Sequence, residues 1–162
     1  ALDEMLLSRL LSRSQRGDLN RLAARSALRP AHPKVLVHGD LHASHLIVDL
    51  ERNSLGFIDL EAMRVGKAAT NFAQLWDAYY IADPLLGQRF YERYAAQFEK
   101  LVDEDFDDDV RTELALRSYR HVQAGKRLGN EALERKAYGL LQRVLDGATF
   151  HEICFGEEDY GS

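Results

Sequence analysis

Three short aliphatic segments, bunched in the first half of the chain, constrain the fold more than any other feature. They are residues 34–37 (KVLV), 45–50 (HLIVDL) and 54–60 (SLGFIDL), and short runs of this composition are typical of β-strands. The turn-forming residues ERNS between the second and third segments predict a β-hairpin. Because the strands are few and do not alternate with helices, a doubly wound sheet is excluded.

Helical patterns flank the strands on both sides. Apolar residues recur with a helical period in 2–13, and a shorter helix is expected over 18–28, with the Arg-Gly-Asp triplet at 16–18 as its starting turn. Two prolines at 29–33 end that helix. From residue 60 onward the pattern is helical throughout, with helices expected at 71–82, 85–101, 107–128 and between Asn130 and Gly147.

The acidic run DEDFDDD (103–109) lies where the helix dipole favours negative charge, and we interpret it as a solvated helix start. Lys126 and Arg127 are interpreted in the same way, as a charge pair at the end of that helix. The aromatic residues Trp76, Tyr79 and Tyr80 are expected to pack in the core. Together the patterns predict a mostly helical α+β fold with a small β-hairpin.

Length and charge limit the class of protein. The 162 residues suit a single domain spanning 1–162, and the formal net charge of −5 argues against a nucleic-acid binder. A single cysteine, Cys154, excludes a disulfide framework and a four-cysteine zinc site. No apolar run reaches the roughly 20 residues of a membrane span, and no signal peptide is visible. A cytoplasmic location is therefore expected.

The segment between the first two strands carries polar residues that could take part in catalysis or bind a metal. His38, Asp40, His42 and His45 fall within eight positions, and Asp59 ends the third strand. A hairpin would return Asp59 to the neighbourhood of His45, at the loop that carries Asp40. Phosphoryl transfer needs a carboxylate at the acceptor hydroxyl and oxygen ligands for Mg²⁺ on the nucleotide. The pattern therefore suits Asp40 in the first role and Asp59 in the second.

The stretch HGDLHASHLIVD, followed by GFIDLEAMRVG, resembles the catalytic core of aminoglycoside phosphotransferases and choline kinases, which share the protein-kinase fold. The resemblance implies that Asp40 is the catalytic aspartate and that His38 is the loop histidine that braces it. It also implies that Asp59 binds the metal and that His45 takes the place of the asparagine that binds metal and nucleotide. The implied cofactors are ATP and Mg²⁺.

His45 is the main departure from that pattern, because imidazole is a poor ligand for Mg²⁺. The lipopolysaccharide core sugar kinases resemble the sequence better here, since their loop has a histidine in this place. Gly39 and His42 then stand where that branch has Arg and Tyr. The resemblance covers about residues 38–80. It implies transfer of the ATP γ-phosphate to a hydroxyl of a sugar or small molecule, with a lipid-linked substrate drawing the protein to a membrane surface.

The resemblance also implies an N-terminal lobe of strands with a phosphate-binding lysine, and nothing in the sequence matches that lobe. The chain is therefore expected to be a C-terminal lobe whose partner is the missing lobe of the same protein, and to bind ATP weakly by itself. Two other readings remain open. One is a non-catalytic pseudokinase, and the other is a zinc-dependent hydrolase built on His38, His42 and His45. Glu61 is either a second acid of the metal loop or a surface charge.

Overall fold

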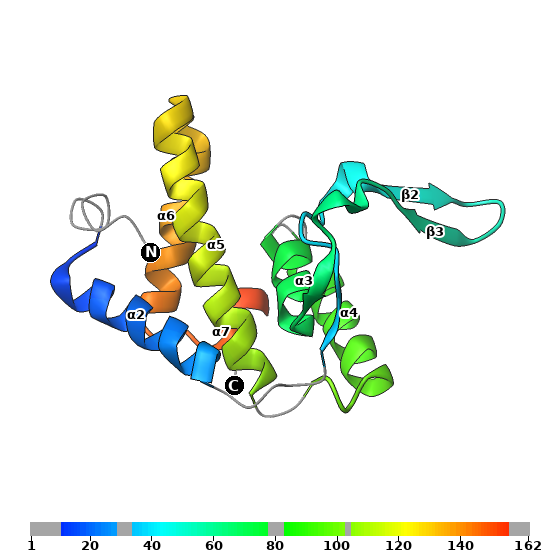
Figure 1. The fold of residues 1–162 in the computed structure, drawn as a ribbon, viewed down its shortest axis with the longest axis horizontal. Coiled ribbons are helices and arrows are strands. Elements are labelled where there is room, and N and C mark those ends of the chain that lie inside the picture. The colour runs from blue at the N-terminus through cyan, green and yellow to red at the C-terminus, as the bar shows by residue number, and fades with distance from the viewer. Residues whose placement is uncertain (1–10, 29–33, 78–82, 103–104, 156–162) are drawn as a thin grey trace, which may run out of the picture.

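The computed structural model describes residues 11–28, 34–77, 83–102 and 105–155, which form a mostly helical fold with two short antiparallel sheets (Figure 1). The elements in these ranges are α2 (Arg13–Leu28), β1 (Val35–Val37), β2 (Leu46–Asp49), β3 (Ser54–Phe57), β4 (Arg64–Gly66), α3 (Ala68–Leu75), α4 (Pro84–Gln97), α5 (Phe106–Leu128), α6 (Glu131–Leu145) and α7 (Phe150–Phe155). Short 3-10 turns lie at Ala43–His45 and Leu60–Ala62. The predicted α+β class is confirmed.

Helix α5 forms the centre of the helical core, where it packs against α2, α3 and α6. The largest side chains that are fully buried there are Trp76, Tyr119, Leu19, Leu114 and Leu141. Burying an apolar side chain of this size contributes about 1.5–3 kcal/mol, so the helices supply most of the stability. The prediction that Trp76 packs in the core is confirmed, whereas Tyr79 and Tyr80 lie outside the described residues.

The predicted hairpin is confirmed by the pairing of β2 with β3. The strands run antiparallel, with Leu46 opposite Phe57 and Asp49 opposite Ser54. The turn is fixed where the backbone N–H of Arg52 donates to Asp49 Oδ1 at 3.0 Å. The hairpin extends away from the helices, as Figure 1 shows. Its two ends therefore join the helical body only through the loops before β2 and after β3.

The second sheet corrects the expectation that the chain is helical from residue 60 onward. Residues Arg64–Gly66 form β4, which pairs antiparallel with β1 so that Val37 lies opposite Arg64 and Val35 opposite Gly66. A three-residue strand has no periodicity of its own, and it exists here because β1 supplies a partner. The pairing places the loop after β1 beside the loop before β4.

Helix α2 corrects the reading of the Arg-Gly-Asp triplet as a starting turn. The helix already begins at Arg13, so residues 16–18 lie inside its second turn. Ser12 and Gln15 cap it reciprocally, because Ser12 Oγ accepts from the Gln15 N–H and the Ser12 N–H donates to Gln15 Oε1. The sequence analysis missed this capping box, because it took the triplet that contains Gly17 as the start of the helix. The expected helix over 2–13 lies mainly outside the described residues.

The acidic start of α5 is only partly solvated, which corrects the reading of the whole run as a solvated helix start. Asp109 is 2% exposed, and its Oδ2 lies 2.9 Å from the Nζ of Lys67, just after β4. Lys67 also donates to the backbone carbonyl of Ser26 in α2 at 2.7 Å. An ion pair of this kind ties α2 and α5 to the residue that precedes α3.

The remaining helices agree with the sequence in position, with shifted ends. The expected 71–82 and 85–101 helices are observed as α3 and α4, and residues 78–82 lie outside the description. In α6 the side chain of Asn130 caps the start as predicted, and Gly147 follows the end with φ 93°. Helix α7 was not predicted. Within the described residues, no helix is both long and apolar enough to cross a bilayer.

Candidate active site

The loop after β1 is held in place by two amide side chains of α3. Asn71 Oδ1 accepts from the backbone N–H of His38 at 3.0 Å. Gln74 bonds the same loop twice, since its Oε1 accepts from the Leu41 N–H at 3.0 Å and its Nε2 donates to the Gly39 carbonyl at 2.8 Å. These bonds bracket the loop from position 38 to position 41. The backbone of Asp40 is therefore fixed by the helical body.

Replacing Gln74 with Ala should destabilise the protein by about 1–3 kcal/mol, because a buried backbone donor and acceptor lose their partner. Chemical denaturation measures this loss. Gln88→Ala is the matched control, since the Gln88 amide donates to exposed Glu92 in a bond of 3.1 Å, and it should cost less than about 0.5 kcal/mol. Equal losses for the two variants would show that Gln74 does not anchor the loop.

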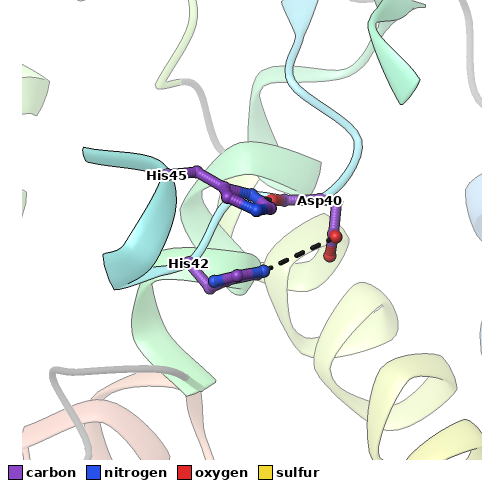
Figure 2. A group of neighbouring side chains, drawn as sticks. All are labelled: Asp40, His42 and His45. Carbon is purple, nitrogen blue, oxygen red and sulfur yellow. Dashed lines mark hydrogen bonds and ion pairs between the residues drawn. The ribbon is translucent and has the colours of Figure 1, made fainter. Parts of the chain in front are cut away.

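The side chain of Asp40 points out of the loop toward solvent and toward His42 (Figure 2). It is 56% exposed, and its Oδ2 lies 3.6 Å from His42 Nε2. On the other side of the imidazole, His42 Nδ1 lies 2.9 Å from the hydroxyl oxygen of Ser44. The carboxylate of Asp40 thus has a fixed backbone and an accessible side chain, which is what a group acting on a bound substrate requires.

His45 lies between Asp40 and Asp59. Its Nδ1 is 2.8 Å from the backbone carbonyl of Asp40, and its Nε2 is 3.3 Å from Asp59 Oδ2. Asp59 adopts a left-handed backbone conformation with φ 59° and ψ 59°, which Asp tolerates better than most residues. The backbone N–H of Ile58, one residue earlier, donates to the His45 carbonyl at 3.0 Å. The hairpin therefore returns Asp59 to His45, as the sequence suggested.

His38 is placed differently from the other two loop histidines. It is 7% exposed, and its Nε2–H donates to the Ile58 carbonyl at 3.0 Å. Its ring stacks on that of His45, with centroids 5.7 Å apart and planes 9° from parallel. The structure therefore places His38 as a brace between the loop after β1 and the end of β3, beneath the exposed groups.

The two loops also touch through their backbones. Gly39 has φ 89°, and a Cβ at this position would lie 2.2 Å from the backbone carbonyl oxygen of Ala62. Ala62 ends the turn that follows Asp59, and Glu61 in the same turn is exposed. Only glycine permits this approach. The site is consequently assembled from two loops in direct contact, one carrying Asp40 and the other carrying Asp59.

Sequence reasoning missed Asn71 and Gln74, the residues that support the loop. The signal was present, because they are polar and lie three positions apart on a short helix whose other residues are largely apolar. Beneath them, Glu113 of α5 bonds the side chain of Thr70 in the first turn of α3. Burial raises the pKa of Glu113 above its usual value, against the opposing effects of Arg120 and Thr70. Glu113 thus helps to fix the supporting helix.

A loop carboxylate held by a helix, and a second carboxylate returned to it by a hairpin, form an arrangement that phosphotransferases use. The chain belongs to the phosphotransferase enzyme family (APH), which matches residues 2–117. No curated protein and no solved structure matches the chain.

Proposed function

We propose that the chain is the C-terminal, catalytic lobe of an ATP-dependent kinase that phosphorylates a hydroxyl of a sugar or other small molecule. Membership of the phosphotransferase family supports the reaction class. The observation that carries the proposal is the exposed carboxylate of Asp40 on a loop whose backbone is bonded to α3 on both sides. Such a carboxylate is accessible to a substrate, and its backbone position is fixed.

In this proposal Asp40 orients the acceptor hydroxyl and accepts its proton as the phosphorus–oxygen bond forms. Its exposure leaves room for an acceptor to approach. His38 acts as a positioning residue, because its contacts are with the Ile58 carbonyl and the ring of His45. It holds the distance between the loop of Asp40 and the loop of Asp59.

Asp59 is the residue best suited to bind Mg²⁺ carried by ATP. Its carboxylate supplies the oxygen donor that Mg²⁺ prefers, and it is about half exposed. His45 fits this ion less well, because its nitrogen is a softer donor. A bound divalent cation would neutralise charge on the nucleotide phosphates and orient them.

For the acceptor we propose a lipopolysaccharide core sugar first, and an aminoglycoside or other small alcohol second. His45 supports the first choice, since that branch has histidine in this place. Gly39 supports the second, because the contact with Ala62 requires glycine where the lipopolysaccharide branch has arginine. The proposed location is cytoplasmic, where ATP is available. A lipid-linked sugar would bring the protein to the membrane surface.

Phosphate transfer from labelled ATP to a panel of acceptors tests the function. The panel holds lipopolysaccharide core oligosaccharide, an aminoglycoside and a small amino alcohol, each assayed with the complete enzyme. Labelling of one class identifies the acceptor. The rival function, a non-catalytic pseudokinase, is favoured by His45 in the place of an asparagine. Absence of transfer and of ATP turnover with every acceptor would support that rival.

The partner we propose is a strand-rich nucleotide-binding lobe, which would cover one face of the hairpin. Val48 lies opposite Leu55 and shares a face with Phe57, and these side chains are 62%, 53% and 49% exposed. The other face carries Asp49 and Ser54, with Ile47 as its one large apolar side chain. An isolated two-stranded hairpin is marginal in water, and an uncovered apolar face of this kind usually marks an interface.

A double substitution, Val48→Lys with Leu55→Lys, should abolish binding of a hydrophobic dye to the hairpin and of the nucleotide lobe supplied in trans. Both side chains are exposed, but the two lysines would lie directly opposite each other, so the free energy of unfolding should fall by up to about 1 kcal/mol. Dye fluorescence and size-exclusion chromatography measure the two effects. Ile47→Lys, on the opposite face, is the control. If only the control lost association, the interface would lie on the face of Ile47, and the proposed face would be wrong.

A further inference from the structure

Two imidazole–carboxylate pairs lie close together in the site. His42 Nε2 lies 3.6 Å from Asp40 Oδ2, and His45 Nε2 lies 3.3 Å from Asp59 Oδ2. The two rings are themselves close, with centroids 3.6 Å apart. One ligand atom from each of Asp40, His42 and His45 lies within 4.8 Å of the others (Figure 2). We propose that these residues, with Asp59 beside them, bind a divalent transition metal such as Zn²⁺, and that its binding inhibits phosphoryl transfer.

The hydrogen bonding of His45 orients its second ring nitrogen for metal binding. A carbonyl oxygen only accepts, so the Nδ1 that faces the Asp40 carbonyl carries the proton. In neutral His45 the Nε2 then presents a lone pair toward the Asp59 carboxylate at 3.3 Å. That lone pair is therefore available to a metal ion that also attracts the carboxylate.

The positions of the two rings allow them to share one ion. A ligand nitrogen of His42, one of His45 and a carboxylate oxygen of Asp40 lie within 4.8 Å of one another, so a single divalent ion can reach all three. Nδ1 bonded to a backbone carbonyl with Nε2 directed at the ion is also the usual orientation of a metal-binding histidine.

Donor type and spacing select the class of metal. Nitrogen–carboxylate sets suit zinc and related transition metals, whereas Mg²⁺ prefers oxygen alone. A tetrahedral zinc with bonds of about 2.0–2.1 Å has roughly 3.3–3.4 Å between its ligand atoms. Within the group, the distance of 3.6 Å between His42 Nε2 and Asp40 Oδ2 is close to that spacing, and the ligand atoms all lie within 4.8 Å of one another. The site therefore matches a nitrogen-binding metal more closely than Mg²⁺.

The metal-binding group in the structure differs by one residue from the three histidines considered from the sequence, His38, His42 and His45. The Nε2–H of His38 donates to the Ile58 carbonyl, and the His38 ring is buried. Asp40 takes its place in the group with His42 and His45. This exchange has a functional consequence, because the metal would bind the carboxylate that we propose as the proton acceptor. A metal-bound Asp40 cannot serve an acceptor hydroxyl.

Isothermal titration of the metal-free 162-residue chain with ZnCl₂ and with MgCl₂ tests the binding. We expect Zn²⁺ to bind at least about 100-fold more tightly than Mg²⁺. His42→Ala should weaken Zn²⁺ binding by at least about 10-fold. His151→Ala is the matched control, since His151 is an exposed histidine far along the chain in α7, and it should leave the affinity unchanged. This arm needs neither nucleotide nor acceptor.

Equal affinity for Zn²⁺ in the wild type and in His42→Ala, or no zinc binding in the wild type, would overturn the proposal. His42 is 40% exposed, so its loss should not unfold the chain, and circular dichroism verifies this. His42→Asn provides a second variant with a smaller change in polarity. It should weaken zinc binding in the same way.

The inhibition rests on the proposed kinase function and is measured separately. In the complete enzyme with MgATP, added Zn²⁺ should lower phosphate transfer, and His42→Ala should raise the inhibitory zinc concentration at least about 10-fold relative to its own uninhibited rate. Zinc binding without any phosphate transfer would contradict the kinase function but would support the metal site. Transfer that is insensitive to bound zinc would refute the inhibitory role alone.

Discussion

Replacing Asp40 with Asn is expected to lower the rate of phosphate transfer by about 10²–10⁴-fold, because the amide cannot accept a proton from the acceptor hydroxyl. The loss should appear in kcat, with little change in the KM for ATP, since the role proposed for the carboxylate lies in the transition state. Its side chain is 56% exposed, so the free energy of unfolding should change by less than about 0.5 kcal/mol. Steady-state kinetics and thermal denaturation measure the two quantities.

Asp49→Asn is the matched control for that experiment. Asp49 is an aspartate nine positions later in the chain, but its carboxylate accepts from the turn at Arg52 and lies at the far end of β2. Asn can still accept that bond, so transfer should be unaffected. If Asp40→Asn kept the wild-type rate, Asp40 would have no catalytic role and the proposed function would lose its supporting observation.

The second large effect is expected at Gly39, where substitution by Ala should destabilise the protein by about 2–5 kcal/mol. A left-handed backbone costs a residue with a Cβ roughly 1–2 kcal/mol. Displacing a packed neighbour adds about 1–3 kcal/mol. Here the neighbour is the carbonyl oxygen of Ala62, only 2.2 Å from the new carbon, and backbone cannot move aside as a flexible side chain can. Urea denaturation measures the loss.

Gly129→Ala separates the two causes of that loss. Gly129 also has a positive φ, 64°, but a Cβ there would meet no atom within 4 Å. Only the backbone cost of about 1–2 kcal/mol should remain. If both alanine variants were destabilised equally, the close approach of Gly39 to Ala62 would not be real. The loops of Asp40 and Asp59 would then be less tightly joined than described.

The hairpin was predictable because its signals are local. Aliphatic runs on both sides of a turn sequence define β2 and β3, and the return of Asp59 to His45 follows from their antiparallel pairing. The helices were predictable from period and caps, as Asn130 shows by accepting from the Leu133 N–H. These features depend on residues that are close in the chain.

What the sequence did not reveal depends on residues far apart in the chain. Strand β4 exists because it pairs with β1, and the burial of Asp109 depends on Lys67, which is 42 positions away. The anchoring of the loop by Asn71 and Gln74 likewise joins residues more than 30 positions apart. Tertiary partners decide such features, so propensity and periodicity cannot supply them.

The two loops of the site are attached to the helical body unequally, but they are joined to each other. The Asp40 loop is bonded to α3, which belongs to the helical body, whereas Asp59 is carried at the base of a hairpin that projects from it. Because His38 and the Gly39–Ala62 contact tie the base of the hairpin to the Asp40 loop, a tilt of the hairpin should displace the turn between β2 and β3 more than it displaces Asp59. The separation between Asp40 and Asp59 is thereby protected from motion of the projecting strands.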